Sequence, residues 1–575
     1  MIMTGWKKGM ASTIALLMVS VLILSACTKS GDKEASESNV NSPPASQDRG
    51  PYFIADRKIS GRIFLENDGA GLPVDQINNE IAQKIKEMTG ITLEFQSTNH
   101  PDGLEELTTA LASGDLPDVI VNYLDHGGRP ENSVILKASR EGVFTDLAPY
   151  LKDTKVYSKY FSDEFLPRDS RENIMLRPEF DGKVFAVHMN IPSTEMTDEE
   201  RVHGRSGMWV RQDIVQALGV DPSKIKTMDQ LYDLAKRIKE GDFKDNNGKP
   251  VTVIGSRFWG GSVTSTLYRN WDFGNGTRFD VDSDGKVKHL AETDYILKQI
   301  EFVRKLLDEG LLDKEAFTMD NVRAEEAMAN GSFAITTYAN VMPDRFLKTR
   351  YVPMDQMYNY KGEDAVYEKY KSGYMSWEIP STTKNPEEIV KFADFLASKE
   401  GKALWKFGIE STHYTLKDGK VILTEEWKKQ RLENPDRIKD VVPTLWGVLL
   451  GSTDNNDVRD FGEEWQKEEN PEMFALSKEL QMFGNPTFKY WDGYSALSYL
   501  TEVPDIEERL KPVLDSYPDI VVKAYFASSM EKATDIVNDY RAQLKKAGVD
   551  KFTAYLQEQY EKDPESVAFY IDALY

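Results

Sequence analysis

Residues 59–95 read ISGRIFLENDGAGLPVDQINNEIAQKIKEMTGITLEF, and this stretch decides the fold. A strand pattern at 59–65 is followed by an amphipathic helix pattern at 75–89, which Gly90 closes. The apolar face of this helix consists of Ile77, Ile81, Ile85 and Met88. A second strand pattern follows at 91–95. The order strand, helix, strand predicts a β-α-β unit with parallel strands.

The same alternation continues directly after this unit, with a helix pattern at 104–112 and a short strand at 116–121. An open sheet of this kind binds ligands beyond the carboxyl ends of its strands. Those ends are residues 66–68, 96–100 and 122–123. We therefore expect Asn122 and Tyr123 to contact a ligand.

A second α/β unit begins after the segment 181–187. Its first strand runs into a helix that Gly219 caps, and Thr227 is a suitable N-cap for the next helix. The strand and helix patterns in this part of the chain are 209–211, 212–218, 228–239, 293–309, 332–338 and 386–398. The fold class is therefore α/β.

Composition limits the function classes. Of 575 residues, 40% are hydrophobic and 29% charged, which is typical of a chain that forms cores, and the length predicts two to four domains. One cysteine excludes a disulfide scaffold and a Cys-rich metal site. The net charge of −23 argues against a nucleic-acid partner, because an acidic chain gains nothing from counterion release.

The first 27 residues resemble a bacterial lipoprotein signal. Lys7 and Lys8 form a basic region, and an apolar run from Met10 to Leu24 follows that is too short for a stable membrane span. The run ends in Leu24-Ser25-Ala26-Cys27, which resembles a lipobox. The alternative is a buried free cysteine, but the position at the end of an apolar run favours lipidation of Cys27.

Residues 28–50 are rich in Ser, Glu, Asn, Pro and Lys, and such a stretch buries too little surface to fold. Removing residues 1–26 takes away two lysines and no acids, so the net charge changes from −23 to −25. An anionic surface repels a body of this charge. We therefore expect a protein that a lipid anchors outside the cell membrane, on a tether, without spanning it.

Six segments of the chain resemble extracellular solute-binding proteins of family 1, the lipoprotein receptors of ABC importers. They occur in the family's order between about residues 59 and 425. The segments are 112–119 (ASGDLPDV), 181–186 (DGKVFA), 209–213 (WVRQD), 302–312 (FVRKLLDEGLL), 383–387 (TKNPE) and 407–414 (FGIESTHY). The chain length is similar to that of the subgroup of oligosaccharide receptors and LipO-type lipoproteins. Residues after about 440 match the family less well.

This resemblance implies a two-lobed, type II periplasmic-binding-protein-like fold with the ligand cleft between the lobes and an extra helical C-terminal region. The implied division is a signal peptide at 1–26, a tether at 27–50, a first N-lobe segment at 51–186, a first C-lobe segment at 187–350, a crossing segment that returns through the N-lobe at 351–378, and the C-lobe remainder with the helical region at 379–575.

The resemblance also implies a receptor, and not an enzyme, that delivers a carbohydrate, in particular an oligosaccharide, to the permease subunits of an ABC importer. A peptide or another polar solute is the first alternative. A cell-surface glycoside hydrolase or lyase is the second, because a catalytic carboxylate pair among 94 acidic residues stays open. No G-x-S-x-G, H-E-x-x-H or Walker motif occurs. We expect a monomer that contacts the membrane only through its lipid.

Ten Trp and 26 Tyr residues suit sugar recognition, in which flat sugar faces pack on rings. Loop-borne and strand-end rings are the candidates for ligand contact, with core packing as the alternative for each: Trp259, Tyr268, Trp271, Tyr338 and Trp377. Trp405 lies on a helix face and is expected in the core. Arg211 is a candidate partner for an acidic sugar, with a structural ion pair as the alternative.

Two acidic segments are candidates for a calcium-binding loop. Asp280-x-Asp282-x-Asp284-Gly285 resembles the start of a calcium loop, but Ala291 occupies the twelfth position, so a hairpin turn is favoured. Residues 242–248 resemble a calcium loop of some oligosaccharide-binding relatives, yet Pro250, Val251 and Thr252 follow where acidic ligands would be needed. We expect no cofactor, and calcium is the one alternative that stays open.

Overall fold

The computed structural model contains two large hydrophobic cores, each assembled from segments far apart in the sequence. The residues it describes, all but one of which belong to the unit Gly50–Tyr575, are 49–64, 79–97, 103–123, 130–161, 176–189, 208–255, 278–319, 321–337, 349–354, 358, 362, 367–369, 375–434, 441, 449–450, 460–469, 471, 474–475, 488–490 and 494–569. Among these residues, no helix combines the length and the apolar character needed to cross a membrane.

The first core surrounds a five-stranded sheet in the order β2-β1-β3-β12-β4. Its strands are β1 (Arg57–Ile63), β2 (Ile91–Ser97), β3 (Val119–Tyr123), β4 (Ala186–His188) and β12 (Met375–Glu378). The elements that pack with them are α1 (Glu80–Thr89), α2 (Gly103–Ser113), α3 (Pro130–Arg140), α4 (Ala148–Leu151), α11 (Pro386–Ala397), α12 (Lys399–Phe407), β13 (Tyr414–Lys417), β14 (Lys420–Leu423), α13 (Glu425–Glu433) and α17 (Glu464–Glu469).

The strand directions confirm the predicted β-α-β order. β1 is parallel to both β2 and β3, and β12 is antiparallel to both β3 and β4. Four strands therefore run in one direction, with β12 alone reversed. Gly61 pairs with Phe95 across β1 and β2, and a Cβ at Gly61 would lie 2.2 Å from the Phe95 ring. Glycine is required there because the ring lies on the backbone.

The second core surrounds a four-stranded sheet in the order β10-β5-β9-β6. Its strands are β5 (Met208–Arg211), β6 (Thr252–Ile254), β9 (Phe333–Thr337) and β10 (Tyr351–Pro353), and its first helices are α6 (Gln212–Leu218), α7 (Met228–Glu240) and α9 (Tyr295–Asp308). α10 (Asn321–Ala329) contributes to a smaller cluster around Trp209. Thr227 caps α7 in a capping box with Gln230, which confirms the predicted start of this helix.

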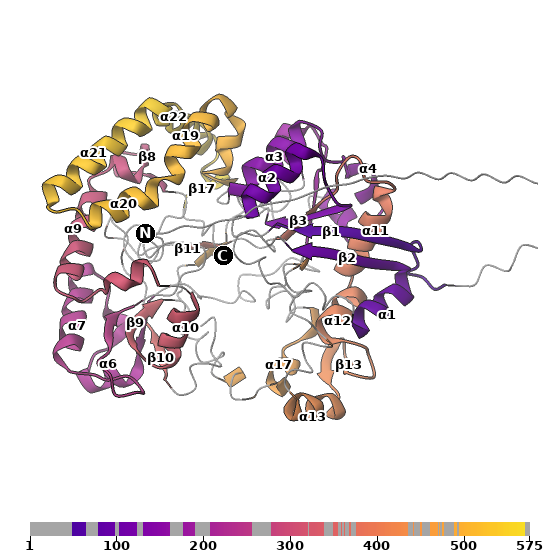
Figure 1. The fold of residues 1–575 in the computed structure, drawn as a ribbon, viewed down its shortest axis with the longest axis horizontal. Helices are drawn as coiled ribbons and strands as arrows, with labels where there is room; N and C mark the ends of the chain where they lie inside the picture. Colours follow the sequence, from indigo (N-terminus) through magenta and orange to yellow (C-terminus); the bar gives the residue numbers. More distant parts are fainter. Residues whose placement is uncertain are drawn as a thin grey trace, which may run out of the picture. The chain divides into compact units, whose positions relative to one another are not determined.

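The C-terminal helices belong to the second core. These helices are α19 (Pro504–Asp515), α20 (Tyr517–Tyr525), α21 (Met530–Ala547) and α22 (Val549–Lys562). They pack beside α9 and the hairpin of β7 (Phe279–Val281) and β8 (Val287–His289), as the yellow helices of Figure 1 show. The Phe552 ring of α22 meets the Phe279 ring edge-on at 5.3 Å.

The structure differs from the expected domain division after residue 378. Ile389, Trp405, Trp427 and Trp465 all pack in the first core with β1 and β3, so the segment 379–465 does not continue the second lobe. The chain passes between the two cores three times, between residues 189 and 208, 354 and 375, and 465 and 496. The periodicity of α11 and α12 is local and carries no information about which sheet they cover.

We expect Phe552→Ala to lower the free energy of unfolding by roughly 3–5 kcal/mol, because the fully buried Phe552 ring leaves a cavity between α22 and β7. Phe526→Ala is the matched control, since the Phe526 side chain is 45% exposed. Denaturant unfolding followed by circular dichroism measures both. Equal losses for the two variants would contradict the assignment of the C-terminal helices to this core.

Candidate functional site

Three polar side chains lie in register across the first sheet, next to its carboxyl edge. Ser376 of β12 pairs with Asn122 of β3 on one side and with His188 of β4 on the other. All three are fully buried. Residues in register project to the same face of a sheet, so these three form one polar row. Glu378 lies two positions along β12 on that same face and is also fully buried.

The Glu378 carboxyl is held in its neutral form. Burial raises the pKa of Glu378 to about 8, and the hydrogen bond from Ser376 offsets this only in part. The Ser376 hydroxyl donates to Glu378 Oε1 at 2.5 Å, while Glu378 Oε2 has no partner among the described residues. A neutral carboxyl both donates and accepts hydrogen bonds.

The Asn122 amide is the second group with unused hydrogen-bonding capacity. Neither its Nδ2 nor its Oδ1 has a partner within the part of the chain that the structure describes, although the residue is fully buried. Leaving a buried polar group unpaired costs about 1–3 kcal/mol. These groups lie at the carboxyl edge of the sheet, where open sheets bind their ligands. The row of Asn122, Ser376, His188 and Glu378 is therefore the candidate site.

Trp377 does not lie on an exposed surface. Its side chain is fully buried in the first core, and its Nε1 donates to the Leu449 carbonyl at 3.0 Å. Its ring lies 6.2 Å from Phe95 and 6.4 Å from Phe392. This placement is contrary to the expectation that Trp377 lines the ligand cleft. The alternation along β12 explains it, because Trp377 projects to the face opposite Ser376 and Glu378.

Arg211 forms a structural ion pair, which is the alternative to binding an acidic sugar. The residue is 6% exposed, and its guanidinium binds the Asp213 carboxylate through two nitrogens, at 3.1 and 2.6 Å. Its Nη1 donates to two backbone carbonyls, so all three guanidinium nitrogens bind the protein. Trp405 is buried, as expected, with its Nε1 bonded to the Leu396 carbonyl.

Of the remaining candidate site residues, the structure describes only Tyr123. The Tyr123 backbone ends β3 beside the polar row, opposite Met375. Trp259, Tyr268, Trp271, Tyr338 and the lipidation candidate Cys27 lie outside the described residues.

Sequence reasoning missed three members of the site: Ser376, His188 and Glu378. The signal for two of them was the alternation Met-Ser-Trp-Glu at 375–378, which puts a hydroxyl and a carboxyl on one face of a buried strand. His188 carries no such signal. Only the register between β12 and β4 brings it into the row.

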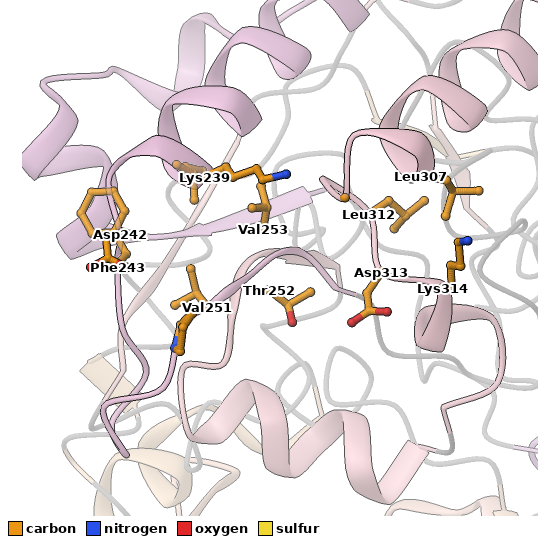
Figure 2. A pocket seen from close by; sticks show the side chains of 13 residues that line it. Lys239, Asp242, Phe243, Val251, Thr252, Val253, Leu307, Leu312, Asp313 and Lys314 are labelled. Carbon is orange, nitrogen blue, oxygen red and sulfur yellow. The ribbon is translucent and has the colours of Figure 1, made fainter.

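A pocket of about 470 Å³ lies elsewhere, beside β6 and α9 (Figure 2). Its lining includes the apolar side chains of Phe243 and Leu312 and the charged side chains of Lys239, Asp313 and Lys314. The pocket contains the residues at the amino end of β6, whereas ligands of open sheets bind at carboxyl ends. The sheet topology therefore favours the polar row over this pocket.

The segment 280–285 forms the hairpin turn that its sequence favours. β7 and β8 are antiparallel, and Gly285 at the turn has a φ of 76°. The Lys288 ammonium binds the carboxylates of Asp282 and Asp284 at 2.8 and 2.7 Å. A lysine thus occupies the space between the acids that a cation would take.

The profile of the family described as bacterial extracellular solute-binding protein matches residues 71–403. Three curated relatives are each 26% identical to the chain over the matched region. Lipoprotein LipO of Bacillus subtilis matches 59% of this chain, and the polygalacturonan/rhamnogalacturonan-binding protein YtcQ of the same species matches 60%. The fructooligosaccharide ABC transporter substrate-binding protein FusA of Streptococcus pneumoniae matches 54%. The matched regions span 65%, 54% and 65% of these relatives' own lengths, less than two thirds of each.

Solved structures resemble the chain over a larger share of its length. The alginate-binding protein AlgQ2 without calcium ion matches with a TM-score of 0.63 and 18% identity, covering 89% of this chain and 99% of that protein. FusA of Streptococcus pneumoniae in complex with kestose matches with a TM-score of 0.61 and 18% identity, covering 88% and 99%. These likenesses support the expected two-lobed fold, including its C-terminal region.

We expect the contribution of Glu378 to the stability of the protein to fall as the pH rises from about 4.5 toward 8. The folded state keeps the proton of Glu378 over that range, whereas the unfolded chain, with a pKa near 4.5, has lost it. Below 4.5 both states are protonated and the penalty vanishes. Between these two pH values, the free energy of unfolding contributed by Glu378 falls by up to roughly 1.4 kcal/mol for each pH unit.

Glu378→Gln should flatten this dependence, because glutamine does not titrate. Denaturant unfolding at several pH values measures the difference between variant and wild type. Glu433→Gln, at an exposed position of α13, is the control and should keep the wild-type slope. A Glu378→Gln profile parallel to that of the wild type would show that Glu378 is ionised in the fold.

Proposed function

Because the chain belongs to the family of bacterial extracellular solute-binding proteins, we propose that it is a receptor that captures an oligosaccharide outside the cell and delivers it to an ABC importer. The observation that carries the proposal is the family match over residues 71–403. Two relatives, FusA and YtcQ, are named for the saccharides that they bind. This supports a carbohydrate as the ligand class.

The proposed mechanism follows from the two cores. A chain that passes three times between two lobes can move them relative to each other while each core stays intact. A ligand that contacts both lobes shifts such an equilibrium toward the closed form. The first lobe would offer its hydrogen bonds near Asn122 and Tyr123.

The proposed ligand chemistry is that of neutral hydroxyl groups. The Asn122 amide and a neutral Glu378 both donate and accept, as does a sugar hydroxyl. Ring stacking would come from Trp259, Tyr268, Trp271 and Tyr338, which stay predictions from the sequence. We also propose that the receptor acts as a monomer and carries out no reaction on its ligand.

A thermal-shift screen over fructans, pectin fragments and other oligosaccharides tests the function. Binding to the folded state alone stabilises it by about 2.7 kcal/mol at a ligand concentration of 100 Kd, so a bound sugar should raise the Tm. Asn122→Ala should weaken that response, while the surface variant Glu433→Gln should not. Analysis of the same mixtures for products separates the classes, because turnover would indicate an enzyme. A response to peptides alone would contradict a carbohydrate ligand.

We propose further that a lipid on Cys27 anchors the receptor at the extracellular face of the membrane. LipO, a relative over 59% of this chain, is named as a lipoprotein. Cys27→Ala should release the protein from membranes or leave it unprocessed, as seen by fractionation and mass spectrometry. Ser30→Ala, three residues into the tether, is the control and should stay membrane-bound. A Cys27→Ala protein that still carries lipid would refute the anchor.

A further inference from the structure

The loop between α7 and β6 is a hairpin with two acidic residues, Asp242 and Asp245. The Asp245 amide donates to the Lys249 carbonyl at 2.8 Å, and the Gly248 amide donates to the Asp245 carbonyl at 3.0 Å. Gly248 has a φ of 76°, which closes the turn. A calcium ion in such a loop needs six to eight oxygen ligands at 2.3–2.6 Å, so the question is whether oxygens are available.

Both carboxylate oxygens of Asp245 are already occupied by donors. Oδ1 accepts from the backbone amides of Asn247 and Lys249, each at 2.9 Å. Oδ2 accepts from Asn330 Nδ2 at 2.7 Å and from Ser332 Oγ at 3.0 Å. Partial burial raises the pKa of Asp245, but these four hydrogen bonds outweigh it and the net pKa is lowered. The carboxylate is thus stabilised by the protein itself.

The Arg211 guanidinium binds one main-chain oxygen of the loop and one of the turn before β9. Arg211 Nη1 donates to the carbonyls of Lys244 at 2.8 Å and Gly331 at 2.7 Å. Its other nitrogens bind Asp213, so one buried cation joins the end of β5, the loop, and the turn before β9. The second acid of the loop, Asp242, pairs with the Lys244 ammonium.

We propose that the Arg211 guanidinium holds this loop in the place of a metal ion, and that the loop neither needs nor binds calcium. A calcium ion would have to displace donors from both carboxylate oxygens of Asp245 and lie beside a buried positive charge. The loop also lacks surplus negative charge, because Lys244 and Lys249 balance its two acids. The inference concerns the assembly of the second lobe and does not depend on which solute the receptor binds.

The first experiment measures the Tm of the purified full-length protein in EDTA and in millimolar calcium chloride. We expect equal values, and no saturable heat on titration with calcium. A calcium-dependent rise of the Tm, or a saturable titration, would overturn the proposal even if the protein binds no sugar at all. A negative sugar screen leaves this result unaffected, so the two failures are distinguishable.

The second experiment tests the role of Arg211 by hydrogen exchange. Arg211→Met should lower the Tm and speed exchange at the loop amides of Asp245, Gly248 and Lys249 by about tenfold or more, which corresponds to a loss of about 1.4 kcal/mol. Arg211→Lys keeps the charge without the planar fork and should give an intermediate rate.

Arg304→Met is the matched control for this experiment. Arg304 also binds backbone carbonyls through Nη1, at Ala524 and Tyr525 (3.3 and 3.0 Å), but in another part of the second core. It should lower the Tm and leave exchange in the loop unchanged. If Arg211→Met does not fold, Arg211→Lys supplies the exchange rates. Loop exchange at the wild-type rate in the Arg211 variant that folds would overturn the proposal.

Discussion

The insertion of β12 between β3 and β4 is the constraint on which the rest of the first lobe depends. Residues 375–378 are more than 180 positions from β4 in the sequence, yet they provide the neighbour that β4 pairs with in the sheet order. Trp377 fixes the strand from one side, through its ring contacts and its bond to the Leu449 carbonyl. The first lobe is therefore complete only after the chain has returned from the second, which is a pairing of high contact order.

The register of β12 sets the core and the candidate site together. Met375 and Trp377 project to one face, and Ser376 and Glu378 project to the other. A shift of one residue would exchange the two sets, and would bring the Glu378 carboxyl against the apolar partners of Trp377. The polar row at the sheet edge and the aromatic packing behind it are thus two consequences of one set of strand hydrogen bonds.

The local sequence pattern predicted the helices and strands well. The helix at 212–218 and the cap at Thr227 are as expected, because apolar periodicity and capping act within a few residues. Asn122 likewise lies near the carboxyl end of β3, as the strand pattern predicts, and its contact with a ligand stays a prediction. Lobe membership of 379–465 and the burial of Trp377 could not be read in this way, because both depend on partners tens to hundreds of positions away.

Buried charge is handled in two ways, and the difference bears on function. Lys402 and Asp460, each 2% exposed, pair at 2.9 Å, and Arg211 pairs with Asp213 while it binds carbonyls. Such pairs fix segments of the chain to one another through opposite charges. Glu378 is instead neutralised by its own proton, and its Oε2 has no partner among the described residues. An ion pair at the sheet edge would present a polar solute with two charges that already bind each other. The Asn122 amide likewise has no partner in the described part of the chain. A neutral acid beside it provides donors and acceptors without a net charge, and that is the chemistry that a neutral hydroxyl-rich ligand requires.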